Sequence, residues 1–372
     1  MDKDFLPEIW YNRTEPDMGG ECEMEAYYYN RMNKAEQSAY HAMKAGFTAL
    51  ASSFPVPRME GAKLSDIFFK LRLDCPEIFY VPSFRYRYFP DSANVEMIPE
   101  YLFDKGKIKE HQAAMKARVE KLARGAKELS EKEKEIYIHD FLCQNVTYDK
   151  LKKPYSHEII GPLGHGVGVC EGIAKSVKVL CDALGIWCII VISGANREKG
   201  IKYRHAWNVV KLGGQYYHLD ATYDNSLSGK GILRYDYLNL DDARIFRDHE
   251  PVLDVIPACP DGNGFYYREK KLSFTKAEEV EKRARQAAKK GKSLVFHWRG
   301  GYLTREQVEE FLKIFESAAS EKGKYARVGL NWSQAVLSVT FEERPQEQEL
   351  LEEEELLKEV TGAQEELPVE KE

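Results

Sequence analysis

Residues 166–186 read GVGVCEGIAKSVKVLCDALGI, and this stretch decides the fold of the central part of the chain. After Cys170, apolar residues from Ile173 to Leu184 recur at the spacing of one helix face, and Gly185 follows as a helix C-cap. The pattern predicts a helix buried on one face, with Cys170 in its first turn. The glycines before the helix let the backbone approach neighbouring segments closely and leave the thiol uncovered.

This position favours a reactive thiol. The unpaired N–H groups and the macrodipole at a helix N-terminus stabilise the thiolate, which is the nucleophilic form. Cys170 is therefore a candidate nucleophile, and its own backbone N–H is a candidate donor to the oxyanion of a tetrahedral intermediate. Judged alone, Cys170 is explained equally well as a small residue in a tight turn.

A second stretch supplies a base and a group to orient it. Two β-rich runs flank the Gly-Gly pair at 213–214, which is typical of a two-residue hairpin turn. With this turn, the numbers of facing residues sum to 427, so that His205 faces Thr222 and Trp207 faces Asp220. His205 and Asp220 then lie on one face as diagonal neighbours, within reach of each other. An imidazole held by a carboxylate is what a nucleophilic thiol requires, so we predict a triad of Cys170, His205 and Asp220.

The motifs also carry a resemblance. The segments GVCEGIAK, RHAWNVV and YYHLDATYDNS, within residues 156–226, resemble the transglutaminase-like superfamily, and most of all its bacterial transglutaminase-core domains. HDFLCQNVTYD at 139–149 and Arg-Asp-His at 247–249 are similar as well. The resemblance implies a papain-like fold, with Cys170 as nucleophile, His205 as general base and acid, and Asp220 orienting the imidazole. Ile173 stands where the family has an aromatic residue, and Tyr223 stands where tryptophan is common; both departures bear on substrate preference.

Further residues are candidates for the cleft or the oxyanion site. Tyr148 is interpreted as a cleft wall or oxyanion donor, or alternatively as a core residue. His157 and His165 precede the nucleophile and either line the cleft or lie in exposed loops. Trp207 is expected to shield the His205–Asp220 pair from water.

The whole chain is predicted to be α+β, with the helix that bears the nucleophile packed on an antiparallel sheet. We expect a mixed helical and β region over 1–102, a catalytic core over 103–255, a small α+β module over 262–345 and an acidic, disordered tail over 346–372. Helices are predicted over 34–50 (capped by Asn33), over 63–73, over 103–144 (with a break near Gly125 and an N-cap at Ser130), over 276–290 and over 304–320. Strands are predicted over 79–81, 84–89, 187–192, 264–274 and 293–298, with two more around Asn331.

Composition excludes several classes of protein. The chain has 372 residues, 43% of them hydrophobic and 31% charged, with no apolar run long enough for a membrane span and no signal-peptide pattern at the start. Residues 346–372 hold eleven Glu and two Lys, and subtracting this −9 from the net −6 leaves +3 for residues 1–345. The near-neutral body indicates neither nucleic acid nor a membrane as partner. Seven scattered cysteines without a CxxC pair favour reduced thiols in the cytoplasm.

The predicted function is acyl transfer through a Cys170 thioester on a protein or peptide amide. Hydrolysis is favoured over transfer to an amine because water is always abundant, although the same triad serves both reactions. The alternatives are a transglutaminase proper and a catalytically silent scaffold that binds protein partners through the C-terminal module or the acidic tail. The motifs indicate neither a metal nor an organic cofactor.

Overall fold

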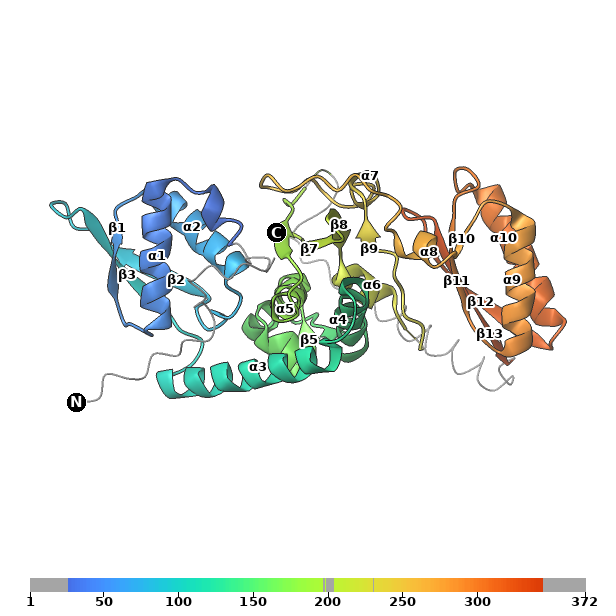
Figure 1. The fold of residues 1–372 in the computed structure, drawn as a ribbon, viewed down its shortest axis with the longest axis horizontal. Helices are drawn as coiled ribbons and strands as arrows, with labels where there is room; N and C mark the ends of the chain where they lie inside the picture. Colours follow the sequence, from blue (N-terminus) through green and yellow to red (C-terminus); the bar gives the residue numbers. More distant parts are fainter. Residues whose placement is uncertain (1–25, 197, 199–203, 230, 344–372) are drawn as a thin grey trace, which may run out of the picture.

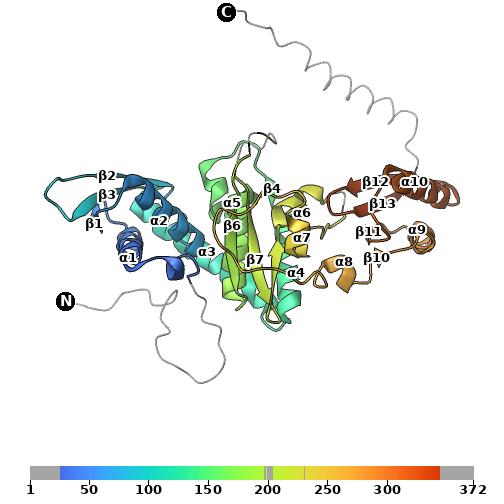
Figure 2. The ribbon, with the colours of Figure 1, turned by 90° about the horizontal axis from the view of Figure 1, so that it is seen from above.

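A computed structural model of the chain describes residues 26–196, 198, 204–229 and 231–343. The ribbon has three parts along its longest axis, with the blue N-terminal part and the orange C-terminal part on opposite sides of a central part (Figures 1 and 2). The structure is mixed α+β, as predicted. The predicted acidic tail at 346–372 lies outside the described residues. Among the described helices, none combines the length and apolar character needed to cross a bilayer.

The N-terminal part, residues 26–102, sets two helices beside a three-stranded antiparallel sheet of order β1-β3-β2. The predicted cap is confirmed: the Asn33 side chain accepts from the first turn of α1, and Glu36 bonds back to the Asn33 backbone. The predicted strand at 79–81 is wrong, because these buried residues follow an irregular path before β2. The elements are η1 (Tyr29–Arg31), α1 (Lys34–Thr48), β1 (Phe54–Pro57), α2 (Gly61–Asp74), β2 (Ser83–Arg87) and β3 (Asn94–Glu100).

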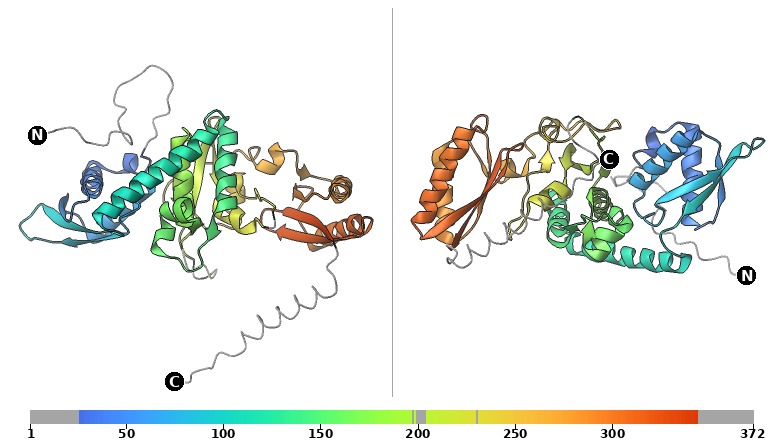
Figure 3. Two further views of the ribbon diagram at one scale, coloured as in Figure 1. Left: turned by 90° about the horizontal axis from the view of Figure 1, so that it is seen from below. Right: turned by 180° about the vertical axis from the view of Figure 1, so that it is seen from behind.

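Two helices connect the N-terminal part to the centre. The predicted break and N-cap are confirmed, since α3 (Lys105–Ala126) ends before a short turn and α4 (Glu131–Asn145) starts with a capping box at Ser130. The long α3 runs alongside both parts (Figure 3). One continuous hydrophobic cluster includes Phe47 and Ile67 of the N-terminal part together with Val177 and Leu180 of the central part. These two parts therefore share a core.

The central part packs α5 (Cys170–Ala183) against an antiparallel sheet of order β6-β7-β8-β9. The left-handed Gly185, with a φ of 74°, ends the turn after α5, as predicted. The predicted hairpin register is confirmed by the pairs Val209–His218 and Leu212–Gln215. The elements of this part are β4 (Thr147–Tyr148), η2 (Pro154–His157), η3 (Ile160–His165), β5 (Val167–Gly168), β6 (Cys188–Ile192), β7 (Ala206–Leu212), β8 (Gln215–Leu219), α6 (Ala221–Leu227), β9 (Leu238–Leu240) and α7 (Asp242–Ile245).

The outer pairs of that hairpin are not as predicted. The ladder between β7 and β8 ends at Asn208 and Leu219, so His205 does not face Thr222 and Trp207 does not face Asp220. The Asp220 backbone N–H donates instead to Tyr237 O at 3.0 Å. The physical reason is that the Asp220 side chain caps α6, which turns the chain out of the strand.

The C-terminal module, residues 262–343, has a four-stranded sheet of order β10-β11-β13-β12 with two helices on one face (Figure 1). Its predicted helices are confirmed, as are the predicted strand at 293–298 and the two strands around Asn331. The predicted strand at 264–274 is wrong. There a short helix precedes a two-residue strand, because Phe265 and Tyr267 turn their rings into the neighbouring core. The elements are α8 (Tyr266–Glu269), β10 (Ser273–Phe274), α9 (Ala277–Lys290), β11 (Leu294–Trp298), α10 (Arg305–Ser320), β12 (Lys324–Asn331) and β13 (Val336–Glu343).

Candidate active site

The backbone before α5 places Cys170 as the first residue of the helix, after an extended Val169. Close packing requires glycine on both sides: a Cβ at Gly168 would lie 2.6 Å from Pro162 Cγ, and one at Gly172 would lie 2.2 Å from Ser156 O. Among the cysteines that the structure describes, Cys170 alone is partly exposed, and the other five are buried. The predicted nucleophile is thus the described thiol that a reagent or substrate can reach.

The structure brings His205 and Asp220 together. His205 Nε2 lies 2.6 Å from Asp220 Oδ2. The other carboxylate oxygen, Asp220 Oδ1, accepts from the backbone N–H groups of Thr222 at 2.8 Å and Tyr223 at 3.1 Å. Burial alone would raise the pKa of Asp220, but the charge and hydrogen bonds of the neighbouring histidines outweigh it and lower the pKa. Asp220 is therefore an ionised carboxylate in a fixed position.

His205 connects this carboxylate to the thiol. Burial disfavours the charged ring, but Asp220 and a hydrogen bond with Cys170 raise the pKa of His205 to about 10. Because Nε2 is bonded to Asp220, the ring nitrogen left for Cys170 is Nδ1. The Trp207 ring lies nearly parallel to the imidazole, with ring centroids 5.7 Å apart, and is 1% exposed. The predicted neighbour of the pair therefore covers one side of His205.

A second histidine bonds to the same carboxylate. His249 Nε2 lies 2.9 Å from Asp220 Oδ2, and His249 Nδ1 lies 2.9 Å from Asp248 Oδ1. In the sequence, Arg-Asp-His at 247–249 contributes only to the family resemblance, and no role in the site is predicted for His249. No local pattern could have placed it there, because 29 residues separate it from its partner Asp220.

Two tyrosines lie beside the nucleophile. Tyr148 pairs with Gly168 in the short parallel ladder of β4 and β5, two residues from Cys170. Burial, and then the charge of Cys170, raise the pKa of Tyr148. The ring of Tyr223, predicted only as a departure from the family pattern, lies at a centroid distance of 4.9 Å from the His205 ring. Burial, and then the charge of Asp220, raise the pKa of Tyr223 to about 12, so both hydroxyls stay protonated at neutral pH.

The predicted cleft residue His157 belongs to a charged cluster at the first turn of α5. Its Nδ1 lies 3.2 Å from Glu171 Oε2, and its side chain is 38% exposed. Lys175, fully buried, bonds to Glu171 Oε1 and Glu158 Oε2, both at 2.8 Å. Arg72 of α2 bonds to the same two carboxylates. His165, by contrast, is exposed and its ring lies 4.9 Å from that of Tyr155.

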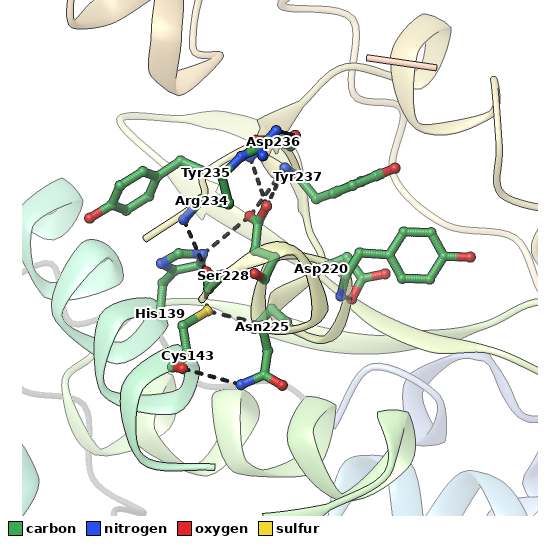
Figure 4. A network of polar contacts seen from close by, with 12 residues as sticks. His139, Cys143, Asp220, Asn225, Ser228, Arg234, Tyr235, Asp236 and Tyr237 are labelled. Atoms are coloured by element: carbon green, nitrogen blue, oxygen red, sulfur yellow. Dashed lines mark hydrogen bonds and ion pairs between the residues drawn. The ribbon is translucent and has the colours of Figure 1, made fainter. Parts of the chain in front are cut away.

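A buried network holds α6 behind the site (Figure 4). His139 of α4 lies 3.2 Å from Asp224 Oδ2 through Nε2, and 3.0 Å from Asp140 Oδ1 through Nδ1. Asp224 Oδ1 also accepts from the Asp236 backbone at 2.7 Å. Cys143 Sγ lies 3.5 Å from His139 Nε2, but this thiol is buried. The network therefore fixes the helix that follows Asp220 rather than offering a second reactive thiol.

Two groups of side chains in the described residues have the composition of a metal site. In the first, the distances of 2.6 Å and 2.9 Å from Asp220 Oδ2 to the two histidines are shorter than the roughly 3.3 Å between ligands around a tetrahedral zinc with 2.0 Å bonds. In the second, Trp207 Nε1 donates to His218 Nδ1, so His218 Nε2 carries the proton that faces Asp242. Both arrangements fit hydrogen bonds better than metal coordination.

Comparison with known proteins agrees with this geometry. Residues 116–221 match the family model of the transglutaminase-like superfamily. The segment includes Cys170, His205 and Asp220, so the resemblance carried by the motifs is confirmed for this transglutaminase-like segment. No curated protein matches the chain.

Three solved structures are similar to part of the chain. They are a TGase (12% identity, TM-score 0.26, 41% of this chain), a candidate cysteine protease from Cytophaga hutchinsonii (16%, 0.25, 38%) and a candidate protease from Parabacteroides distasonis (15%, 0.23, 38%). The matches cover 47%, 61% and 37% of those chains, less than two thirds of each.

Proposed function

We propose that the chain catalyses thiol-dependent acyl transfer on protein or peptide amides, with hydrolysis as its main outcome. The observation that carries the proposal is the His205–Asp220 bond of 2.6 Å, which leaves one ring nitrogen for the partly exposed Cys170. This is the arrangement in which a base activates a thiol and an anion holds the base. The match of residues 116–221 supports the same chemistry.

The reaction proceeds in two steps. The Cys170 thiolate attacks the amide carbonyl, and the tetrahedral intermediate expels the amine, which takes its proton from the His205 imidazolium. The neutral His205 then removes a proton from water, whose oxygen attacks the thioester and releases the acid and Cys170. Asp220 stays ionised throughout and stabilises the imidazolium.

Two groups near Cys170 are candidates to donate hydrogen bonds to the oxyanion. The Cys170 N–H is the first of α5 and has no acceptor within the helix. The Tyr148 hydroxyl, protonated at neutral pH, comes from the strand that pairs with the segment before Cys170. We assign these two groups to the oxyanion site and give His157 no direct role, because Glu171 holds its ring.

The charged cluster supports hydrolysis over transfer to an amine. An amine acceptor such as lysine is drawn to a free carboxylate, and Glu171 is the acidic residue next to the nucleophile. Its carboxylate is already bonded to Lys175, Arg72 and His157. The six cysteines that the structure describes are all free thiols. This supports our proposal that the protein works in the reducing cytoplasm.

The test is alkylation by iodoacetamide from pH 5 to 9, with mass spectrometry of each cysteine. Exposure alone would make Cys170 react faster than the buried cysteines, so the parent must be compared with His205→Ala. Because the pKa of His205 is about 10, the imidazolium persists across this range, and we expect fast reaction of Cys170 even at pH 6. An ordinary thiol with a pKa of about 8.5 is less than roughly 1% ionised there, so His205→Ala should slow the reaction about tenfold or more.

A product assay then identifies the acceptor. The parent and Cys170→Ala are incubated with a mixed protein substrate and a fluorescent primary amine. New peptide termini or released ammonia without label, lost in Cys170→Ala, establish hydrolysis, whereas label on the substrate establishes amine transfer. If His205→Ala leaves Cys170 reactivity unchanged, the thiol is not activated and the chain is a silent scaffold.

A further inference from the structure

The bonds of His249 identify its charge state. Nε2 faces Asp220 and Nδ1 faces Asp248, each at 2.9 Å. An ionised carboxylate only accepts hydrogen bonds, so the ring must donate from both nitrogens and is an imidazolium. Burial opposes this charge, but the two carboxylates outweigh it and raise the pKa of His249.

His249 cannot itself touch a substrate. The side chain is 1% exposed, and aromatic rings surround it. The Tyr223 ring lies at a centroid distance of 4.5 Å and the Trp207 ring at 4.9 Å. The His205 ring lies at a centroid distance of 5.2 Å, but the hydrogen bond of His249 on this side goes to the Asp220 carboxylate. Asp220 is therefore the group through which hydrogen bonds connect His249 to His205 and Cys170.

The hydrogen bond between His249 Nδ1 and Asp248 connects His249 to the C-terminal module. Asp248, which bonds His249, accepts from the Tyr237 hydroxyl at 2.6 Å and from Gln334 Nε2 at 3.3 Å. Gln334 lies in the turn between β12 and β13, is fully buried, and also donates to Arg244 O at 3.2 Å. A side chain of the module is thus inserted into the central part, four hydrogen bonds away from His205.

We propose that His249 is a positioning residue for Asp220, and that the C-terminal module holds it in place through Gln334 and Asp248. The inference rests on the proposed function, because it assigns the module a part in activating Cys170. The chain Asp248–His249–Asp220–His205–Cys170 alternates in charge from carboxylate to thiolate. Each cation orients the anions beside it, so displacement of Gln334 loosens the carboxylate that holds the base.

The experiment compares full-length variants. His249→Leu removes both donors, His249→Gln keeps one donor that can reach Asp220, and Gln334→Leu removes the link from the module. Ser338→Ala is the matched control. Ser338 is a buried residue of the same hairpin, and its side chain accepts from Arg234 at 3.1 Å and donates to Gly329 O, not to Gln334 or Asp248. Thermal unfolding verifies that each variant is folded.

Two readouts are needed. The first is the alkylation rate of Cys170. It should fall on the order of 10-fold to 100-fold in His249→Leu, which is the effect expected when a catalytic group is misplaced by about 1 Å. In Gln334→Leu the fall should be smaller. The second is the protonation of His205, followed by NMR on protein labelled with 15N-histidine. Loss of a positioned Asp220 should lower the pKa of His205 from about 10 toward its ordinary value. His249→Gln should restore most of both signals, and Ser338→Ala should change neither.

The two readouts separate the hypotheses. If removal of the positive charge of His249 acted only electrostatically, the pKa of His205 would rise instead of falling, and the positioning role would be wrong. If the pKa of His205 is unchanged in His249→Leu, the positioning role of His249 is wrong. If it is unchanged in Gln334→Leu, the role of the C-terminal module is wrong. If Cys170 is not activated in the parent, the proposed function fails, while the NMR result still decides the positioning role. The ionisable groups that face His249 or His205, and must be considered in any such titration, are Asp220, Asp248, Cys170, His218, Tyr148, Tyr223 and Tyr237.

Discussion

Replacing Glu135 by Gln is expected to stabilise the protein at high pH and not at low pH. Glu135 lies on α4, fully buried, and Asn239 Nδ2 donates to its Oε2 at 2.8 Å. The other oxygens of this pair, Glu135 Oε1 and Asn239 Oδ1, both lack a partner and are buried. An ionised Glu135 has no donor to offer to these two acceptors, whereas a protonated Glu135 supplies an O–H.

The magnitude follows from the pKa. Burial, opposed by the bond from Asn239, raises the pKa of Glu135 from 4.5 to about 7. Below pH 4.5 the acid is protonated in both the folded and the unfolded states, so it adds no pH dependence. Above that value the unfolded state ionises first, and stability falls until the folded state also ionises near pH 7. The difference between a pKa of 4.5 and one of about 7 corresponds to roughly 3 kcal/mol of lost stability at pH 8.

Glutamine keeps the neutral pair at every pH, since its N–H donates where the acid would. The free energy of unfolding of Glu135→Gln, measured by urea denaturation, should therefore gain about 3 kcal/mol relative to the parent between pH 4 and pH 8. The exposed Glu128→Gln is the control, and its difference from the parent should stay within about 0.5 kcal/mol. A flat difference for Glu135→Gln over this range would refute the reasoning, because Glu135 would then be ionised in the folded protein.

Two further substitutions test the supports of the nucleophile. Gly172→Ala places a Cβ 2.2 Å from Ser156 O. We therefore expect the free energy of unfolding in urea to fall by about 1–3 kcal/mol and the alkylation of Cys170 to become slower. Gly229→Ala is the control and should change neither quantity, because there is open space around Gly229. Lys175→Met leaves the buried Glu158 and the half-buried Glu171 with one fewer cation and should cost about 3–5 kcal/mol in the same assay. A loss below about 1 kcal/mol would contradict the assigned ion pairs.

Local patterns were sufficient to predict the two elements that carry the site. The spacing after Cys170 predicts α5, and the Gly-Gly pair fixes the hairpin because both glycines have positive φ, 55° and 84°, as a tight turn between twisted strands requires. The hairpin then brings His205 near Asp220 even though the last predicted pairs do not form. Register is a local property of the turn, which is why it could be predicted without knowing the rest of the fold.

The remaining contacts depend on segments that meet only in the folded chain. Asp220 leaves the strand because it caps α6, and a strand pattern cannot distinguish a cap from one more ladder residue. The rings of Phe265 and Tyr267 look like a strand in sequence, but they pack into the core from a short helix, where the Tyr267 hydroxyl bonds Asp236 at 3.0 Å. His249 and Gln334 enter the site through contacts across 29 and 86 residues, which carry no periodic signal.

The structure itself argues against a silent scaffold. Asp220 is 1% exposed, yet it is held ionised by two imidazoles and two backbone N–H groups. Burying such a charge costs several kcal/mol, and an apolar residue of similar size would stabilise a fold that needed only to bind a partner. Arg72 from the N-terminal part bonds the residue after Cys170, while Gln334 from the C-terminal module reaches Asp248. The N-terminal part therefore helps to fix the segment of Cys170, and the C-terminal module helps to fix the residues that bond Asp220. This arrangement is expected where the position of a thiol relative to its base matters.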